Sequence, residues 1–210
     1  MVGGYAVAAY GQPRYSQDLD FVLPEGAKED VVPWLEALNF RVRTPVNPGR
    51  GFRDSTRLIR GDFSIDLMFG YVRDRDTATR IEGDWIFARP RQVRLRLLNR
   101  STRALVTVAR PEALWLTKIV AGRDQDLADL FAISEEPIDD SEVRAVLESL
   151  ANARLEAKLK GVVTRLGSKK VYSDALSSRA LGKQDDPSNL RAWSKFMRLI
   201  ESILPANLAT

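Results

Sequence analysis

Two aspartates two residues apart, Asp18 and Asp20, lie in a run of residues that is otherwise apolar up to Leu23. An extended strand directs residues two apart to the same face, so the two carboxylates would project together. Like charges at that distance repel each other, and a divalent cation between them removes the conflict. Such a metal can activate a hydroxyl and neutralise phosphate charge in phosphoryl transfer. The alternative is a pair of solvated turn acids, because Asp-x-Asp often arises by chance.

A third acid, Asp66, stands at the centre of the strongly apolar run 63–69. If this run forms a strand next to the first, Asp66 lies beside the acid pair, and three carboxylates could hold one or two metal ions. Two alternatives remain open. Asp66 could pair with Arg57 or Arg60, or its face of the strand, shared with Ser64, could simply be solvated.

A glycine pair, Gly3 and Gly4, opens a short apolar stretch 14 residues before Asp18. Glycine lets the backbone approach a ligand closely, and a helix N-terminus presents free N–H groups to an anion. A lone glycine pair is weak support, but here a short helix and a turn separate it from the acid pair. The order predicts a phosphate cradle beside a metal-binding carboxylate pair.

The chain contains no cysteine and no histidine. Disulfides, thiol nucleophiles and thiolate zinc sites are therefore excluded, and so are Ser-His triads and imidazole metal ligands. Catalysis has to use carboxylates, Lys, Arg, hydroxyls, backbone groups or cations bound by oxygen. Mg²⁺ or Mn²⁺ is the metal that such ligands favour.

The elements that would position these residues form a mixed α/β fold of the α+β kind. With 210 residues, 44% of them hydrophobic and 29% charged, the chain suits one medium domain, or a domain with a small helical appendage. We predict a core at 1–110 and a helical region at 111–210, with a soft boundary. The predicted strands are 18–23, 40–42, 57–60, 63–69, 85–88, 93–98 and 106–108, with Gly61-Asp62 as a hairpin turn.

Helical spacing and capping residues predict the remaining elements. The predicted helices are 27–38, 111–133 as one long helix or a broken pair, 141–166 with Ser141 as its N-cap, and a last helix capped by Ser188. The segment 44–51 reads as an exposed loop. The last helix has an apolar stripe of Leu190, Trp193, Phe196, Met197, Ile200 and Leu204.

The glycine pair, the segment 14–20 and Asp66 together resemble a known family, the nucleotidyltransferase superfamily of the polymerase-β type. The resemblance implies that a nucleoside triphosphate (NTP) binds with its triphosphate against Gly3 and Gly4. It also implies the reaction, which is transfer of a nucleoside monophosphate from the NTP to a hydroxyl, with release of pyrophosphate.

The same resemblance implies roles for the polar residues of the motif. Asp18, Asp20 and Asp66 would bind two Mg²⁺ (or Mn²⁺) ions, and Asp66 would also be the candidate base for the attacking hydroxyl. Arg14 and Ser16 lie where similar proteins carry Arg and Ser or Thr. They would orient phosphate or brace the loop.

A second block, which starts at Pro111, is similar to the AbiEii/MenT type of nucleotidyltransferase-like toxins. It combines a Pro-Glu helix start, Lys118 within the helix, and Arg123-x-x-Asp126-x-x-Asp129-Leu after it. The likeness implies that Lys118 reaches phosphate and that Asp126 assists in the site, with Asp129 or Arg123 binding nearby. The alternative is an amphipathic helix whose charged residues form i,i+3 pairs.

The resemblance extends over residues 2–133, and the C-terminal third matches no family that we can name. Similar proteins usually have a helix before the glycine pair, whereas here only Met1 and Val2 precede it. We therefore expect either a longer native start or the loss of that helix.

Charge is distributed unevenly along the chain. Residues 1–150 contain 21 Lys/Arg and 23 Asp/Glu, whereas residues 151–210 contain 11 and 5. A basic tail suits a nucleic-acid partner, and a solvated helical surface is an equally good interpretation. A row of arginines could follow phosphates or protect an exposed sheet edge, and it comprises Arg89, Arg91, Arg94, Arg96, Arg100 and Arg103. Trp193 and Phe196 could stack on bases, but their place on the apolar stripe favours the core.

These observations predict a Mg²⁺-dependent nucleotidyltransferase whose acceptor is RNA, such as the 3′ end of tRNA, with a cognate antitoxin as a partner. One alternative is an enzyme that modifies a small molecule such as an aminoglycoside. Another is a nucleotide-binding or partner-binding module without catalysis. No apolar run is long enough to cross a membrane, and the first residues do not read as a signal peptide, so we expect a cytoplasmic protein.

Overall fold

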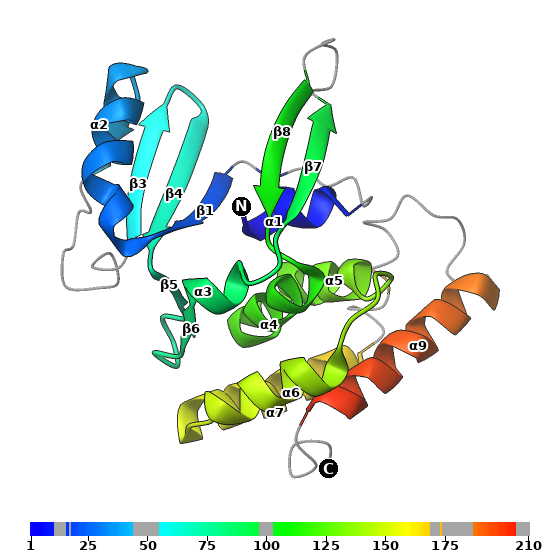
Figure 1. Cartoon of the computed structure of the whole chain (residues 1–210). Helices are drawn as coiled ribbons and strands as arrows, with labels where there is room; N and C mark the ends of the chain where they lie inside the picture. The colour runs from blue at the N-terminus through cyan, green and yellow to red at the C-terminus, as the bar shows by residue number, and fades with distance from the viewer. Residues whose placement is uncertain are drawn as a thin grey trace.

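The computed structural model describes residues 1–10, 16, 18–43, 55–96, 103–168, 173 and 187–204, with only the backbone at 95, 96, 103, 187 and 188. Arg14, the loop predicted at 44–51 and the side chain of Ser188 lie outside this part. Figure 1 shows a sheet with one helix against it, a β-hairpin beside it, and a body of helices below.

The main sheet has four strands in the order β1-β4-β3-β2. They are β1 (Asp18–Leu23), β2 (Arg41–Val42), β3 (Ser55–Arg60) and β4 (Phe63–Phe69). β1 runs parallel to β4, whereas β3 is antiparallel to both β4 and β2. The predictions of these strands and of the turn between β3 and β4 are confirmed, and Gly61 supplies the left-handed turn conformation with a φ of 58°.

The two faces of this sheet have different neighbours. One face carries the side chains that pack with α2 (Lys28–Ala37), which follows the short 3₁₀ helix η1 (Glu25–Ala27). Its small apolar cluster comprises Leu35, Phe40, Leu58, Ile65 and Leu67. Because strand residues alternate between faces, Asp18, Asp20 and Asp66 lie on the opposite face. That face is turned toward α1 (Gly3–Ala8) and the helical body.

Two small antiparallel sheets follow the main one. β5 (Tyr71–Arg73) pairs with β6 (Arg80–Glu82), and neither strand was predicted. The strand predicted at 85–88 is wrong, because α3 (Gly83–Ile86) occupies this segment. A four-residue apolar run fits a strand and a helical turn equally well. Here the turn buries Ile86 while the Trp85 indole donates a hydrogen bond to Glu142.

The second small sheet is the hairpin of β7 (Arg91–Arg96) and β8 (Arg103–Val108). The sequence predicted strands here, at 93–98 and 106–108, but not their pairing. Two arginines of the predicted row are already engaged. Arg89 pairs with Glu142 at 2.6 Å, and Arg91 pairs with Glu136 at 3.3 Å. The segment 97–102, with Arg100, lies outside the described residues, as do the side chains of Arg96 and Arg103.

The predicted helix at 111–133 is a broken pair, α4 (Pro111–Ala121) and α5 (Asp124–Ile133). Gly122 separates the two helices with a φ of 59°, the left-handed conformation that ends many helices. The prediction of one helix at 141–166 is wrong. The segment contains α6 (Asp140–Ser149) and α7 (Ala153–Leu166).

The N-cap predicted for this segment is also wrong. Asp139, not Ser141, caps α6 by accepting a hydrogen bond from the Glu142 backbone at 3.0 Å. Asn152 restarts the chain as the N-cap of α7, accepting from the backbone N–H groups of Arg154 and Leu155. Both residues are favoured N-caps because a short side-chain oxygen reaches the free N–H groups of the first turn.

The last helix, α9 (Pro187–Ile203), packs on α6. Trp193 and Phe196 lie against Phe131, with ring centroids 5.3 and 5.5 Å from it, so the prediction of core residues is confirmed. Leu190 is 49% exposed, so its place on the buried stripe is wrong. Arg191, Lys195 and Arg198 are exposed on the outer face of the same helix.

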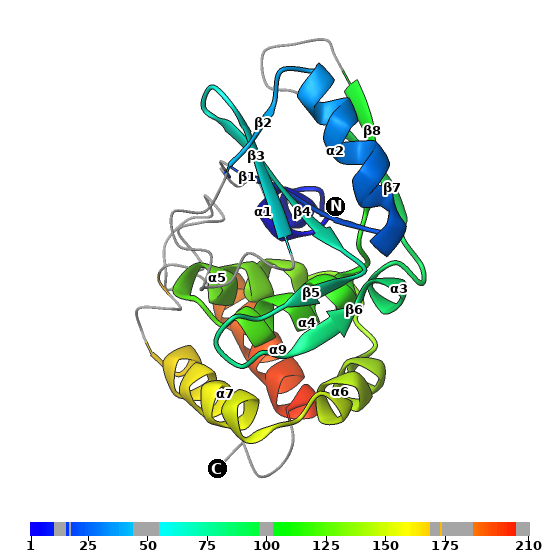
Figure 2. The same ribbon diagram turned by 90° about the vertical axis from the view of Figure 1, so that its left-hand side faces the viewer.

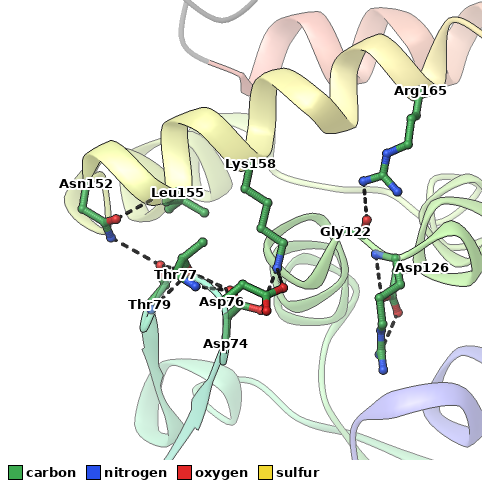
Figure 3. Close-up of polar contacts among 11 residues, drawn as sticks. Asp74, Asp76, Thr77, Thr79, Gly122, Asp126, Asn152, Leu155, Lys158 and Arg165 are labelled. Carbon is green, nitrogen blue, oxygen red and sulfur yellow. Dashed lines mark hydrogen bonds and ion pairs between the residues drawn. The ribbon is translucent and has the colours of Figure 1, made fainter.

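Helix α7 is fastened to the turn of the β5–β6 hairpin by polar contacts (Figure 3). Lys158 reaches both Asp74, at 2.8 Å, and Asp76, at 3.1 Å. Asn152 donates a hydrogen bond to Thr79 at 3.4 Å. These contacts join the end of the sheet region to the C-terminal helices.

One hydrophobic cluster joins these parts. It includes Val7 of α1, Val22 of β1, Trp115 of α4 and Phe196 of α9, all of them buried. Figure 2 shows α4 and α5 beneath α1 and the main sheet, with α6, α7 and α9 farther out. The core is thus continuous across the boundary expected near residue 110, and the division into two domains stays a prediction. No helix in the described part of the chain is long and apolar enough to span a membrane.

Candidate active site

Three charged residues form a row across three neighbouring strands. Asp20 of β1 lies opposite Asp66 of β4, and Asp66 lies opposite Arg57 of β3. Asp18 lies one pair along the same face, opposite Ser64, whose hydroxyl donates a hydrogen bond to the Asp18 carboxylate. The strand register therefore brings the three predicted carboxylates to one region of one face, as the sequence suggested.

The glycine pair lies directly over this row. Val2 donates a backbone hydrogen bond to the Asp20 carbonyl at 2.9 Å, which fixes the start of α1 to β1. Gly3 has a φ of 71°, and a Cβ atom there would lie 1.9 Å from Oδ2 of Asp20. Only glycine fits, because any side chain would overlap the carboxylate. Gly4 is buried in the first turn of the helix.

Asp20 is the acid of this row whose pKa is raised. Burial, followed by the nearby charge of Asp66, raises its pKa from 3.8 to about 6, with a smaller contribution from Asp18. Lys118 and Arg123 act in the opposite direction but do not outweigh these effects. In the described part of the chain no side chain forms an ion pair or a hydrogen bond with the Asp20 carboxylate.

Asp66 is engaged by Arg57 instead. Nε of Arg57 donates to Oδ1 of Asp66 at 2.7 Å, and Nη2 donates to Oδ2. Nη2 also lies 3.6 Å from Oδ2 of Asp18. The hydrogen bond to Asp66 raises the pKa of Arg57 above its ordinary value. The sequence analysis left a pair between Asp66 and Arg57 or Arg60 as an alternative. The strand register shows that Asp66 pairs with Arg57, because position 57 lies opposite position 66.

A second charged cluster joins α4 to α5. Nζ of Lys118 lies 2.9 Å from Asp126 and 2.7 Å from Asp129, and the side chains of all three residues are less than a tenth exposed. Arg123 adds an i,i+3 pair to Asp126 at 2.6 Å, and its backbone N–H donates to the same carboxylate. Burial alone would raise the pKa of Asp126, but Lys118 and Arg123 outweigh it and lower that pKa.

The positions of the other predicted residues complete the comparison with the sequence. Ser16 donates to the backbone carbonyl of Asp18 at 3.3 Å, so it braces the entry to β1. Arg14 lies outside the described residues. Among the residues that the structure describes, no three acidic side chains are close enough together to hold a metal ion as they stand. The metal site therefore stays a prediction.

A comparison with known protein families gives one match, which extends over residues 1–207. The matching family is described as the nucleotidyl transferase AbiEii toxin of type IV toxin–antitoxin systems. The chain belongs to the AbiEii family. No curated protein matches it.

Membership of the AbiEii family confirms the resemblance that the two sequence blocks carried, and it agrees with the mixed α/β fold. The match also extends beyond residue 133, through the C-terminal helices that the sequence analysis could not assign to any family. An AbiEii chain is a nucleotidyltransferase toxin of a toxin–antitoxin system, which implies a cognate antitoxin.

Proposed function

We propose that this AbiEii chain transfers a nucleoside monophosphate from an NTP to a hydroxyl group of an RNA, with Mg²⁺ (or Mn²⁺) as the cofactor. The acceptor oxygen attacks the α-phosphorus, the bond to the β-phosphate breaks, and pyrophosphate leaves. The proton of the hydroxyl goes to Asp66.

The observation that carries this proposal is the register of β1 and β4 under the glycine pair. It sets Asp20 beside Asp66, with Gly3 in contact with Asp20. A ligand at the start of α1 would therefore approach the carboxylates. The backbone N–H groups there suit a triphosphate, because they are donors with no competing side chain.

The donors at this row fit a hard cation. They are carboxylate oxygens with a nearby hydroxyl, in a chain without histidine or cysteine, and Mg²⁺ and Mn²⁺ prefer such oxygens. Burial, followed by the charge of Asp66, raises the pKa of Asp20, so a cation at the row would favour its ionised form. Asp18, Asp20 and Asp66 would hold the metal, which supplies phosphate neutralisation and activation of the hydroxyl.

The cations of the α4–α5 cluster, Lys118 and Arg123, act on the carboxylate row. Lys118 lowers the pKa of Asp20, as does Arg123, so both cations are close enough to affect the carboxylate row. In the proposal Lys118 reaches a phosphate oxygen of the NTP, and Asp126 holds the ammonium group in position.

Two charge patterns favour RNA as the acceptor. Arg191, Lys195 and Arg198 lie exposed at helical spacing on α9, and residues 151–210 contain twice as many basic as acidic residues. The arginine row near the β7–β8 hairpin contributes less than its sequence suggested, because Arg89 and Arg91 pair with glutamates.

The test is transfer of label. The protein is incubated with Mg²⁺, each α-labelled NTP in turn and total tRNA, and labelled RNA is measured. We expect transfer by the natural sequence and a loss of about a thousandfold or more in Asp18→Ala and Asp66→Ala, because both remove a transition-state ligand. Asp62→Ala is the matched control, since this exposed acid lies in the turn of the same β3–β4 hairpin.

The outcomes separate the alternatives. Label on an aminoglycoside but not on RNA would support the small-molecule enzyme. Saturable NTP binding without transfer to any acceptor would contradict the enzyme and support a binding module. Equal transfer by Asp62→Ala and Asp66→Ala would show that the carboxylate row is not the site.

A further inference from the structure

The guanidinium of Arg57 contacts two of the carboxylates to which the proposed function assigns a divalent cation. It takes both oxygens of Asp66 and lies 3.6 Å from Asp18. Strand register fixes this arrangement, because position 57 lies opposite 66 on the same face of the sheet. Arg57 therefore touches two of the three carboxylates expected to bind metal.

The contact is accessible enough to be exchanged. The side chains of Arg57, Asp66 and Asp18 are 26%, 20% and 40% exposed, respectively. A pair that is partly open to water is screened more than a fully buried pair, so less energy is needed to exchange it. By contrast, the Lys118 pairs on α4 and α5 are almost fully buried. Compared with Lys118, Arg57 is the cation that is open enough to exchange its partner.

A single guanidinium does not satisfy the carboxylate row. Its contacts are to Asp66 and Asp18, and no described side chain pairs with the Asp20 carboxylate beside them. A divalent ion brings twice the charge and accepts several carboxylate oxygens at once, which a guanidinium in one plane does not. A metal ion and the Arg57 guanidinium on the same carboxylate would repel each other as like charges.

We propose that Arg57 is an internal competitor of the divalent cation, which has to displace its guanidinium from Asp66 and Asp18 before the site can act. The proposal rests on the proposed function, because it assumes that these carboxylates bind metal. In the metal-free protein, Arg57 holds Asp66 in place. Once displaced, it leaves all three carboxylates to the metal.

Mn²⁺ binding measured by electron paramagnetic resonance tests the proposal without reference to activity. We expect Arg57→Gln to bind Mn²⁺ about tenfold or more tightly than the natural sequence, because the competing charge is gone. Arg57→Lys keeps the charge but loses the two-point contact, so its affinity should fall between the two. Thermal unfolding without metal shows whether each variant is folded.

Arg60→Gln is the matched control. Arg60 lies on the same strand but bonds the Leu38 carbonyl and stacks on Phe40, away from the acids. It removes an equal charge, so its Mn²⁺ affinity should change less than about twofold.

Three results would overturn the inference. Equal or weaker Mn²⁺ binding by Arg57→Gln would show that Arg57 is only a structural partner, while leaving the proposed function intact. An equal gain in Arg60→Gln would show that only net charge matters. If neither the natural sequence nor Arg57→Gln binds Mn²⁺ at millimolar concentration, the metal part of the proposed function fails as well.

Discussion

The two charged clusters of this protein differ in how well their charges balance. On α4 and α5, two buried carboxylates face the buried Lys118 and the exposed Arg123, so the charges of this cluster sum to zero. On the sheet, Arg57 is the one cation that pairs with the three carboxylates among the described residues, and burial and Asp66 raise the pKa of Asp20 to about 6. Balanced burial suits a group that holds its neighbours in position, whereas uncompensated acids suit a group that awaits a cation.

The largest effect on stability should come from breaking the balanced cluster. Lys118→Met leaves Asp126 and Asp129 buried without their shared cation, and we expect a loss of about 3–5 kcal/mol in the free energy of unfolding. Urea unfolding followed by circular dichroism measures it.

Lys158→Met is the control for this substitution. Lys158 also bridges two aspartates (Figure 3), but Asp76 is 78% exposed, and Asp74, which is 11% exposed, keeps two hydrogen bonds from Thr77 when the lysine is removed. We expect a loss of only about 1 kcal/mol. Equal losses in the two variants would mean that burial does not distinguish the clusters.

The sheet cluster should respond in the opposite direction. Asp20→Asn removes an uncompensated charge, so we expect it to raise the free energy of unfolding by about 2 kcal/mol at pH 7 while abolishing transfer. Destabilisation at pH 7 would show that the Asp20 charge is compensated by a partner. Asp62→Asn, an exposed acid of the same sheet, should change neither property.

The pH dependence of this gain follows from the direction of the shift. The folded protein holds the Asp20 proton up to about pH 6, whereas the unfolded chain releases it near 3.8. Between these values the folded state binds more protons, so the natural protein loses stability as the pH rises through this window. The advantage of Asp20→Asn should therefore vanish below about pH 4.

The smallest effect should come from the exposed edge of the balanced cluster. The Arg123 side chain is 76% exposed, and Asp126 keeps Lys118 when Arg123 is removed. We expect Arg123→Ala to lower the free energy of unfolding by less than about 1 kcal/mol. A loss as large as that of Lys118→Met would place both cations in one indivisible network.

Local patterns were enough to predict the sheet part of the site. The apolar runs around Asp20 and Asp66 predict strands, and the period of two places acids on one face. The same patterns did not predict which arginine pairs with Asp66, because that pairing depends on the register between strands. The turn at Gly61 sets this register, and from it the pairing of 57 with 66 can be counted.

The failures have equally specific causes. The apolar run at Trp85 is too short to show a period, and its packing against Glu142 is a contact with a distant helix. The break between α6 and α7 was readable from Asn152, a favoured N-cap, but the helical pattern on either side concealed it. Lys118 was identified by family likeness, whereas its double contact with Asp126 and Asp129 depends on how α4 and α5 pack.

The hydrogen bond between Ala109 and Met1 means that the site cannot assemble until well after the N-terminus has been synthesised. Ala109 donates a backbone hydrogen bond to the Met1 carbonyl at 3.0 Å, so the lead-in to the glycine pair is held between β1 and the end of β8. Lys118 and Asp126 come later still. A ribosome needs on the order of several seconds to reach these residues after Gly3. A nascent chain, or one terminated before Asp129, therefore lacks an assembled site.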